Sequence, residues 1–322
     1  MSIEKVIART LEVLQDKGFE TSRPYINERS AINIVARSGS KLFLIKVLED
    51  LLNLRSQCAL EIKKASYALR AHPIVVSEKE ADNEIDRGAA YEKQGIYAVH
   101  PDALLEYFEG GKQYVYYKGG RFYVKIDGKK LREIRERIGL SLGGLANLLG
   151  VTRKAVYEYE KGEMDATVDV AFRLYEVLKR YVDEEEVIQA FKPINILSDV
   201  TVEDFKKEES LGGAGRQRLQ EEVALKLSRL GFSIFKFKDA PFNIIAKKNG
   251  EGGKTILILT VETLSDRSRK GVEVLKGVAE VAKVRRLVVA RKTLRKEDGV
   301  INAKKLEDIS SPEELIEVSS MS

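Results

Sequence analysis

The sequence predicts a multidomain fold, α/β plus all-α, in which two similar α/β domains flank a central helical domain. Three observations support this prediction. Residues 1–110 alternate helical and strand patterns, and the last hundred residues repeat them. Between them, the apolar spacing from Leu131 to Glu163 is that of short helices joined by tight turns. A chain of 322 residues also exceeds the commonest size of one domain.

Composition excludes several classes of protein. The single cysteine, Cys58, excludes an internal disulfide, and two histidines are too few to complete a Cys/His zinc cluster. No run approaches the roughly 20 apolar residues that span a bilayer. Glu4 interrupts the N-terminus where a signal peptide would be apolar. We therefore expect a cytoplasmic protein with no membrane partner and no cofactor.

The positive charge of the chain is concentrated in its centre. The formal net charge is +5, and between Lys118 and Tyr181 fourteen Lys or Arg stand against nine Asp or Glu. The flanking regions together are therefore close to neutral. A local basic surplus favours contact with phosphates more than a modest overall charge does.

The first α/β domain is expected over residues 1–110. An amphipathic helix carries Ile3, Ile7, Leu11 and Leu14 and ends before Gly18-Phe19. β-branched and aliphatic runs then predict strands, and a longer helical pattern lies between them. The expected elements are strands at 32–36 and 42–48, a helix at 54–69, strands at 73–76 and 95–99, and a helix at 101–108.

Residues 111–127 are expected to form a β-hairpin connector. Aromatic and β-branched runs flank Lys118-Gly119-Gly120-Arg121, which is typical of a tight turn. The aromatic side chains could stack on nucleic acid or pack within the sheet, and strand propensity favours packing. These side chains are Tyr114, Tyr116, Tyr117, Phe122 and Tyr123.

A helix-turn-helix is expected within the helical domain at residues 128–194. The first helix starts at Asp127 or Gly128 and stops at Gly139, and Ser141 is the N-cap of the second. Gly150 permits the turn, and Thr152 caps a third helix. Further helices are expected at 167–181 and 184–191. The predicted buried residues of the motif are Leu131, Ile134, Ile138, Leu145, Ala146, Leu148, Leu149, Val151, Val156 and Tyr159.

This motif resembles the helix-turn-helix of Cro and the phage repressors (XRE-type), through Leu145-Ala146, Leu148–Thr152 and Tyr159–Glu163. The family implies double-stranded DNA as partner, read in the major groove by the helix from Thr152 to Lys161, by a homodimer with two half-sites. Leu142-Gly143-Gly144 departs from the family, which usually has a Gln there that touches a phosphate. The resemblance assigns Arg153, Lys154 and Tyr157 to base edges and Thr152 and Lys161 to the backbone, with Ser141 and Glu158 also at the interface.

After a linker at 195–215, residues 216–322 repeat the first domain. The linker contains Leu211–Gly215, which lacks the strand and the Gly-Lys-Ser/Thr ending of a phosphate-binding loop. The repeated segments keep their order and spacing. They are Gly18-Phe19 with Gly231-Phe232, Ile32–Arg37 with Phe242–Lys247, Leu42–Val47 with Ile256–Val261, and Ile74–Val76 with Leu287–Val289.

The repeated pattern resembles the fold of restriction endonucleases and archaeal Holliday-junction resolvases. Those enzymes hold Mg²⁺ with an Asp on the second strand and an acidic residue two positions before a Lys on the third. Here these positions are Asn33, Leu44 and Lys46. We therefore predict no metal site and no catalytic residue, unless Glu49, Asp50 or Glu262 replaces the missing carboxylates, and Lys46 is a possible phosphate contact. In the second copy the matching residues are predicted to be Asn243, Ile258 and Thr260.

The whole arrangement is also similar to a group of archaeal helix-turn-helix transcriptional regulators, through the passage from Tyr114 to Ala146 and the chain length. The sequence thus predicts a dimeric, sequence-specific DNA-binding transcriptional regulator that is not an enzyme. Two alternatives stay open. One is a metal-dependent or structure-selective nuclease or junction-binding protein, and the other is a scaffold that binds protein through the same helix face.

Overall fold

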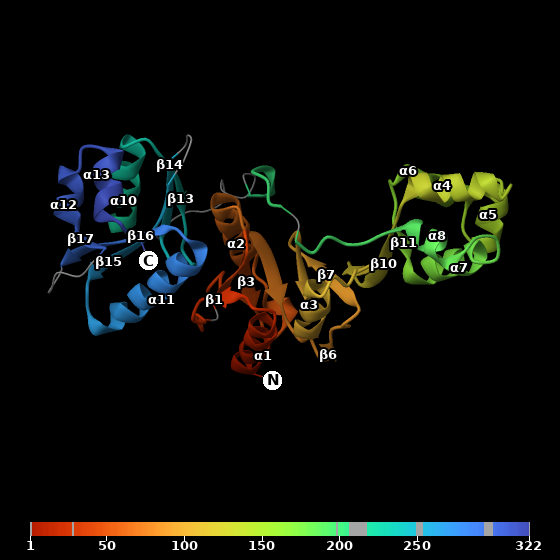
Figure 1. Ribbon diagram of the computed structural model, residues 1–322, viewed down its shortest axis with the longest axis horizontal. Coiled ribbons are helices and arrows are strands. Elements are labelled where there is room, and N and C mark those ends of the chain that lie inside the picture. Colours follow the sequence, from red (N-terminus) through yellow and green to blue (C-terminus); the bar gives the residue numbers. More distant parts are fainter. Residues whose placement is uncertain are drawn as a thin grey trace. The chain divides into compact units, whose positions relative to one another are not determined.

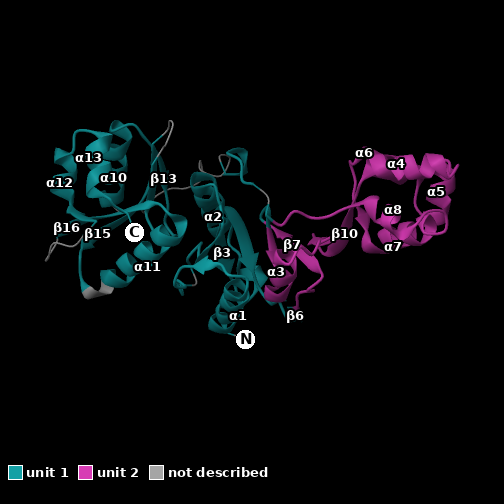
Figure 2. Cartoon of the chain, viewed as in Figure 1, with its two compact units in different colours: residues 1–83, 94–96, 197–322 teal, residues 84–93, 97–196 magenta. Residues whose placement is uncertain are grey.

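The computed structural model describes residues 2–27, 29–197, 199–205, 218–248, 254–292 and 299–321. The chain forms two compact units (Figure 2). The first contains residues 1–83, 94–96 and 197–322, and the second contains residues 84–93 and 97–196. Within the described residues, no helix has the length and apolar character needed to cross a membrane.

The N-terminal part of the first unit is a small α/β fold. Helix α1 (Ile3–Asp16) buries Val6, Ile7, Val13 and Leu14, a spacing that places them on one face. Strands β1, β2 and β3 pair antiparallel in order, and β4 joins β3 in parallel after the crossover helix α2. The bounds are β1 (Glu20–Thr21), β2 (Ile34–Ser38), β3 (Lys41–Val47), the 3-10 helix η1 (Leu51–Asn53), α2 (Ser56–Leu69) and β4 (His72–Val76).

The C-terminal part of the first unit has the same element order and strand pairing. Strands β13, β14 and β15 are antiparallel, and β16 joins β15 in parallel after the helix α11. The repeat in the sequence is therefore also a repeat of structure. The bounds are α10 (Arg218–Arg229), β13 (Phe232–Lys236), β14 (Ile244–Lys248), β15 (Thr255–Thr263), α11 (Asp266–Ala282) and β16 (Arg285–Lys292), followed by β17 (Val300–Asn302), α12 (Ala303–Asp308), α13 (Pro312–Val318) and β18 (Ser320–Met321).

The hydrogen bonds of one asparagine in each copy show which residues of the two copies are structurally equivalent. Asn33 donates its backbone N–H to the Ile45 carbonyl at 2.8 Å, and its side-chain oxygen accepts the Val47 N–H at 2.9 Å. Asn243 makes the same two bonds, to Ile258 and Thr260, at 2.8 and 2.7 Å. The predicted equivalence of Leu44 and Lys46 with Ile258 and Thr260 is therefore wrong by one residue. The true equivalents of Leu44 and Lys46 are Leu257 and Leu259.

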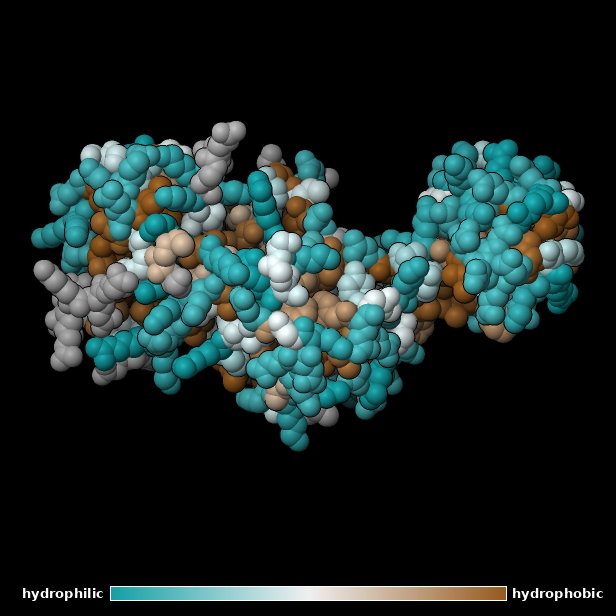
Figure 3. Space-filling model, in the orientation of Figure 1, coloured by the Kyte–Doolittle hydropathy of each residue, from teal (hydrophilic) through white to brown (hydrophobic). Residues whose placement is uncertain are grey.

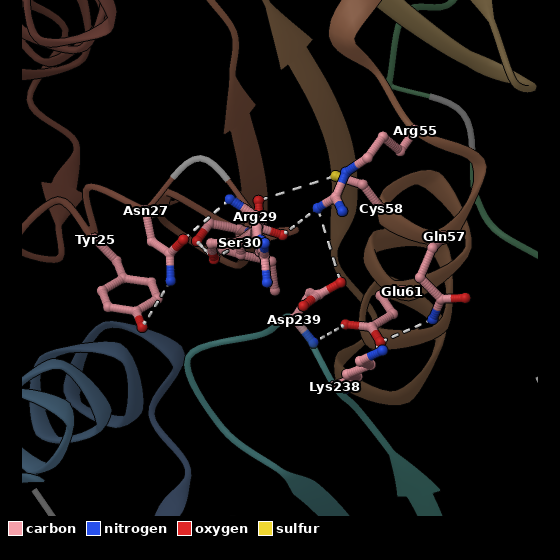
Figure 4. A network of polar contacts seen from close by, with 11 residues as sticks. Tyr25, Asn27, Arg29, Ser30, Arg55, Gln57, Cys58, Glu61, Lys238 and Asp239 are labelled. Carbon is pink, nitrogen blue, oxygen red and sulfur yellow. Dashed lines mark hydrogen bonds and ion pairs between the residues drawn. The ribbon is translucent and has the colours of Figure 1, made fainter. Parts of the chain in front are cut away.

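The two copies contact each other through side chains that bond to backbone. The buried Glu61 carboxylate, on α2, accepts the N–H groups of Lys238 and Asp239, both at 2.8 Å (Figure 4). Arg37, on β2, donates to the carbonyls of Val281 and Ala282 at 2.6 and 2.8 Å, at the end of α11 where carbonyls lack helical partners. Each copy thus satisfies polar groups of the other.

The second unit combines a mixed sheet with a helical bundle (Figure 1). The sheet order is β8-β7-β9-β10-β11, and β12 also pairs with β10. Strands β9 and β10 are antiparallel across Gly119 and Gly120, whose φ values of 56° and 86° suit glycine. The bounds are β7 (Ala89–Lys93), β8 (Ile96–Val99), α3 (Pro101–Phe108), β9 (Val115–Lys118), β10 (Arg121–Ile126), β11 (Ala166–Thr167) and β12 (Phe191–Lys192). A separate small sheet, most of which belongs to the first unit, pairs β5 (Lys79–Glu80) with β6 (Asn83–Glu84).

The bundle buries most of the predicted motif residues. Leu131, Leu145 and Val156, from three successive helices, are fully buried in one cluster. The prediction that Leu148 faces inward is wrong, because it is 45% exposed. Leu145, Ala146 and Leu149 form the buried stripe of their helix, and Leu148 lies to one side of it. The helices are α4 (Gly128–Arg137), α5 (Leu142–Leu149), α6 (Arg153–Lys161), α7 (Val168–Leu178) and α8 (Glu184–Gln189).

The compact units divide the chain differently from the predicted domains. Residues 84–93 and 97–110 belong to the same unit as the helical bundle, not to the first α/β fold. The predicted boundaries at 110, 127 and 194 stay predictions. The glycine-rich segment at 211–215 lies outside the described residues.

Candidate nucleic-acid interface

Two side chains start the helices of the motif as the sequence predicts. The Ser141 hydroxyl accepts the Gly144 N–H at 2.9 Å, and the Thr152 hydroxyl accepts the Ala155 N–H at 3.1 Å. Each bond satisfies one of the N–H groups that a helix start leaves without a partner. Gly162, with φ of 70°, ends α6 in the left-handed conformation that L side chains rarely adopt. The sequence therefore fixes the length of α6 at both ends.

The outer side of α6 is polar and basic. Arg153, Lys154 and Tyr157 are exposed, the last with 47% of its surface accessible, whereas Val156 and Tyr159 are buried. The Lys161 ammonium lies 4.9 Å from the centre of the Tyr157 ring, and hydrogen bonding to Tyr157 raises the pKa of Lys161. Most of the visible surface over the bundle is hydrophilic (Figure 3). The three residues predicted to contact base edges therefore share one solvent-facing surface.

The basic side chains on α6 differ in whether they have an ion-pair partner within the protein. Lys154 lies 3.5 Å from the Glu158 carboxylate, one turn along the helix, which leaves Glu158 less available to a partner. Within the described residues, no hydrogen bond or ion pair engages the Arg153 guanidinium. Arg153 is therefore the cation on this surface that is most available to an external acceptor.

A buried ion pair joins α6 to α4 and was missed by the sequence reasoning. Arg135 donates to both carboxylate oxygens of Glu160, at 2.5 and 3.0 Å, and to the Leu140 carbonyl at 2.8 Å. The two side chains are 9% and 7% exposed, and hydrogen bonding to Glu160 raises the pKa of Arg135. One feature of the sequence could have indicated this pair: each of the two amphipathic helices carries a charged residue beside its apolar stripe.

Gly128 is a second missed residue, at the start of α4. A Cβ atom built there would overlap the carbonyl oxygens of Tyr159 and Glu160, at the end of α6. The two helices approach so closely that only glycine fits at this point. Gly128 and the Arg135–Glu160 pair together set the position of α6 against α4.

Among the described residues, no three His, Cys, Asp or Glu side chains are grouped so that they could hold a metal ion. Asn33 uses its amide oxygen and nitrogen to bond to the backbone, and Leu44 is fully buried. The three carboxylates that could replace the missing metal ligands make other contacts. Asp50 accepts the N–H groups of Leu52 and Ala81 at 2.8 and 3.1 Å, Glu49 lies 4.0 Å from Lys79, and Glu262 lies 3.0 Å from Arg291.

Two family models match the chain. A PD-(D/E)XK superfamily domain matches residues 3–113, and a helix-turn-helix matches residues 131–184. The protein is therefore of the class that joins a helix-turn-helix to a nuclease-like domain. Both resemblances expected from the sequence are confirmed for these segments.

Archaeal relatives match nearly the whole chain. A Pyrococcus abyssi protein is 33% identical over 99% of this chain and 97% of its own length, and a Pyrococcus horikoshii protein is 33% identical over 95% and 94%. A Thermoplasma acidophilum protein is 28% identical over 97% and 96%. All three carry the name "Putative HTH-type transcriptional regulatory protein". The chain belongs to this archaeal family. No solved structure is significantly similar to it.

Proposed function

We propose that this protein is a sequence-specific regulator of transcription that binds double-stranded DNA through the outer side of α6. The observation that carries the proposal is the basic, exposed surface of a correctly capped α6, with Arg153 unengaged among the described residues. An Arg at this position can donate two hydrogen bonds to O6 and N7 of one guanine. Lys154 and Tyr157 would contact neighbouring bases, and Ser141, Thr152, Glu158 and Lys161 the edges of the site.

We infer a homodimer as the binding form. One motif of this size contacts few base pairs, and two-fold proteins gain specificity from two half-sites about 34 Å apart. The modest basic surplus around the motif supports contact with the DNA backbone but does not by itself discriminate between sequences. Base contacts from α6 are therefore needed for a specific regulator.

Replacing Arg153 with alanine is expected to lower affinity for the preferred site by roughly 5- to 150-fold, because a bidentate guanine contact contributes roughly 1–3 kcal/mol. The preferred site would be selected from genomic fragments, and affinity measured on it and on a scrambled duplex. Affinity for the scrambled duplex is expected to change much less, because only the phosphate contact of Arg153 is lost there.

Arg87→Ala is the matched control. Arg87 is also an exposed arginine of the second unit, pairs with Asp102 at 3.1 Å, and lies outside the helix-turn-helix. It should leave both affinities unchanged. Equal losses on both duplexes in Arg153→Ala, or no preferred site at all, would contradict sequence reading by α6.

We further propose that both α/β copies are restriction-endonuclease-like domains without catalytic function. The shared element order and the paired asparagines Asn33 and Asn243 support one fold for both copies. The second copy lacks even the lysine, since Leu259 replaces it. Conversion of both copies into binding or packing domains accounts for these replacements.

The nuclease match favours one alternative, a metal-dependent nuclease, and this has a direct test. Purified protein is expected to leave duplex and four-way-junction DNA intact with Mg²⁺ or Mn²⁺, because Asn33 and Leu44 cannot supply the anionic ligands that these ions require. The measurement is cleavage on denaturing gels at saturating protein. Cutting that is abolished by EDTA and by Lys46→Ala would establish the alternative.

A further inference from the structure

A basic pocket lies beside Lys46 in the first α/β copy. It has a volume of about 510 Å³, and its polar walls include Arg29, Lys46, Glu49, Asn53 and Arg55. Leu48 and Leu52 supply apolar surface. The pocket therefore collects three cations and one carboxylate around Lys46, the lysine that the first copy retains from the nuclease pattern.

The three cations differ in burial, and Arg55 is held in place. Lys46 is only 1% exposed, whereas Arg29 is exposed. Arg55 donates to the Arg29 carbonyl at 3.0 Å and lies 3.8 Å from the Asp239 carboxylate of the second copy (Figure 4). These contacts orient its guanidinium, and Asp239 offsets part of its charge. Contacts with the second copy thus help to order the pocket wall.

Lys46 and Arg55 line the same pocket, and both act electrostatically on the nearby Cys58 thiol. Burial raises the pKa of the Cys58 thiol, and the positive charges of Lys46 and Arg55 oppose that rise. The Glu61 carboxylate is also nearby, but it accepts the N–H groups of Lys238 and Asp239. Its charge is therefore already partnered by donors from the second copy.

The chemistry of these walls suits an anion better than a metal ion. Guanidinium groups donate parallel hydrogen bonds that match phosphate oxygens, and a buried ammonium adds a point charge. The carboxylates that would hold a divalent ion are replaced by Asn33 and Leu44. The pocket walls instead carry three positive side chains and a single carboxylate, Glu49.

We propose that this pocket binds a phosphate group without a metal ion, through Lys46, Arg29 and Arg55. The phosphate comes either from a DNA backbone or from a small phosphorylated molecule. The second copy has Leu259 in place of Lys46, so the site belongs to the first copy. This binding is independent of base reading by α6.

The first test is calorimetric titration of the full chain with inorganic phosphate and with deoxyadenosine monophosphate, both in EDTA. Binding is expected, and Arg29→Gln and Arg55→Gln should each weaken it at least ~5-fold, as the loss of a charge-assisted hydrogen bond predicts. Arg29 is exposed, so its replacement should leave the fold intact. Arg9→Gln is the control, because the Arg9 side chain is 42% exposed and pairs with Glu12 on α1, outside the pocket.

The salt dependence of DNA binding distinguishes a phosphate of the DNA backbone from that of a small phosphorylated molecule. If the phosphate belongs to DNA, Arg29→Gln should reduce the slope of log affinity against log salt by about 0.9. If it belongs to a small molecule, the slope stays unchanged while deoxyadenosine monophosphate binds and the variants weaken it. The proposal is overturned if neither phosphate compound binds and wild type and Arg29→Gln show the same salt slope. It is also overturned if the phosphate compounds bind equally well to wild type, Arg29→Gln and Arg55→Gln. Arg153→Ala in the same assay tests base reading separately.

Discussion

Arg135→Leu is expected to lower the free energy of unfolding of the helix-turn-helix region by about 3–5 kcal/mol, the usual effect of breaking a buried ion pair. The variant leaves the Glu160 carboxylate, 7% exposed, without its guanidinium, and the Leu140 carbonyl without its donor. An unpaired buried charge costs more than the pair itself contributes. Urea denaturation followed by circular dichroism measures the change.

The control for this variant is Arg132→Leu on the same helix. Arg132 pairs with Glu136 at 2.9 Å, but both side chains are largely exposed, so the loss should be only about 0.3–0.5 kcal/mol. Arg135→Leu combined with Glu160→Leu should recover much of the lost stability, because no buried charge then remains. Equal effects of Arg135→Leu and Arg132→Leu would show that Glu160 finds solvent or another partner.

Features set by local sequence could be predicted for this protein. Ser141 and Thr152 cap their helices as expected, and Gly150 and Gly162 have positive φ where the helices end. Apart from Leu148, the apolar spacing identified the core of the motif, because the helical period places these residues on one face. The same local signals fixed which side of α6 is exposed, and so the candidate reading residues.

Features that depend on contacts between distant residues could not be predicted. The strand from Thr255 to Thr263 contains alternating Ile and Leu, so hydrophobicity fits two registers and the sequence match was wrong by one residue. The hydrogen bonds of Asn243 distinguish the correct register from the incorrect one. The bonds of Glu61 and Arg37 join residues about two hundred positions apart, and no local pattern marks them. The basic pocket depends on the same long-range packing.

Gly128→Ala is expected to destabilise the second unit by about 3 kcal/mol, the upper end of the cost of overpacking. Its methyl group would overlap the carbonyl oxygens of Tyr159 and Glu160, which are backbone atoms and cannot rotate away as a side chain would. Relief requires α4 and α6 to separate, which also stretches the Arg135–Glu160 pair. Thermal unfolding measured by calorimetry should show the loss as a lower transition temperature for this unit.

Gly143→Ala is the matched substitution, and its effect should have the opposite sign. Gly143 lies within α5, and the nearest atom to an added Cβ is the Ser141 hydroxyl oxygen at 3.9 Å, an ordinary contact. Alanine should therefore stabilise the helix by about 0.5–1 kcal/mol, because glycine loses more backbone entropy on folding. If Gly128→Ala also stabilises the protein, helix propensity and not close approach governs Gly128, and the position of α6 then depends on the Arg135–Glu160 pair and the shared apolar core.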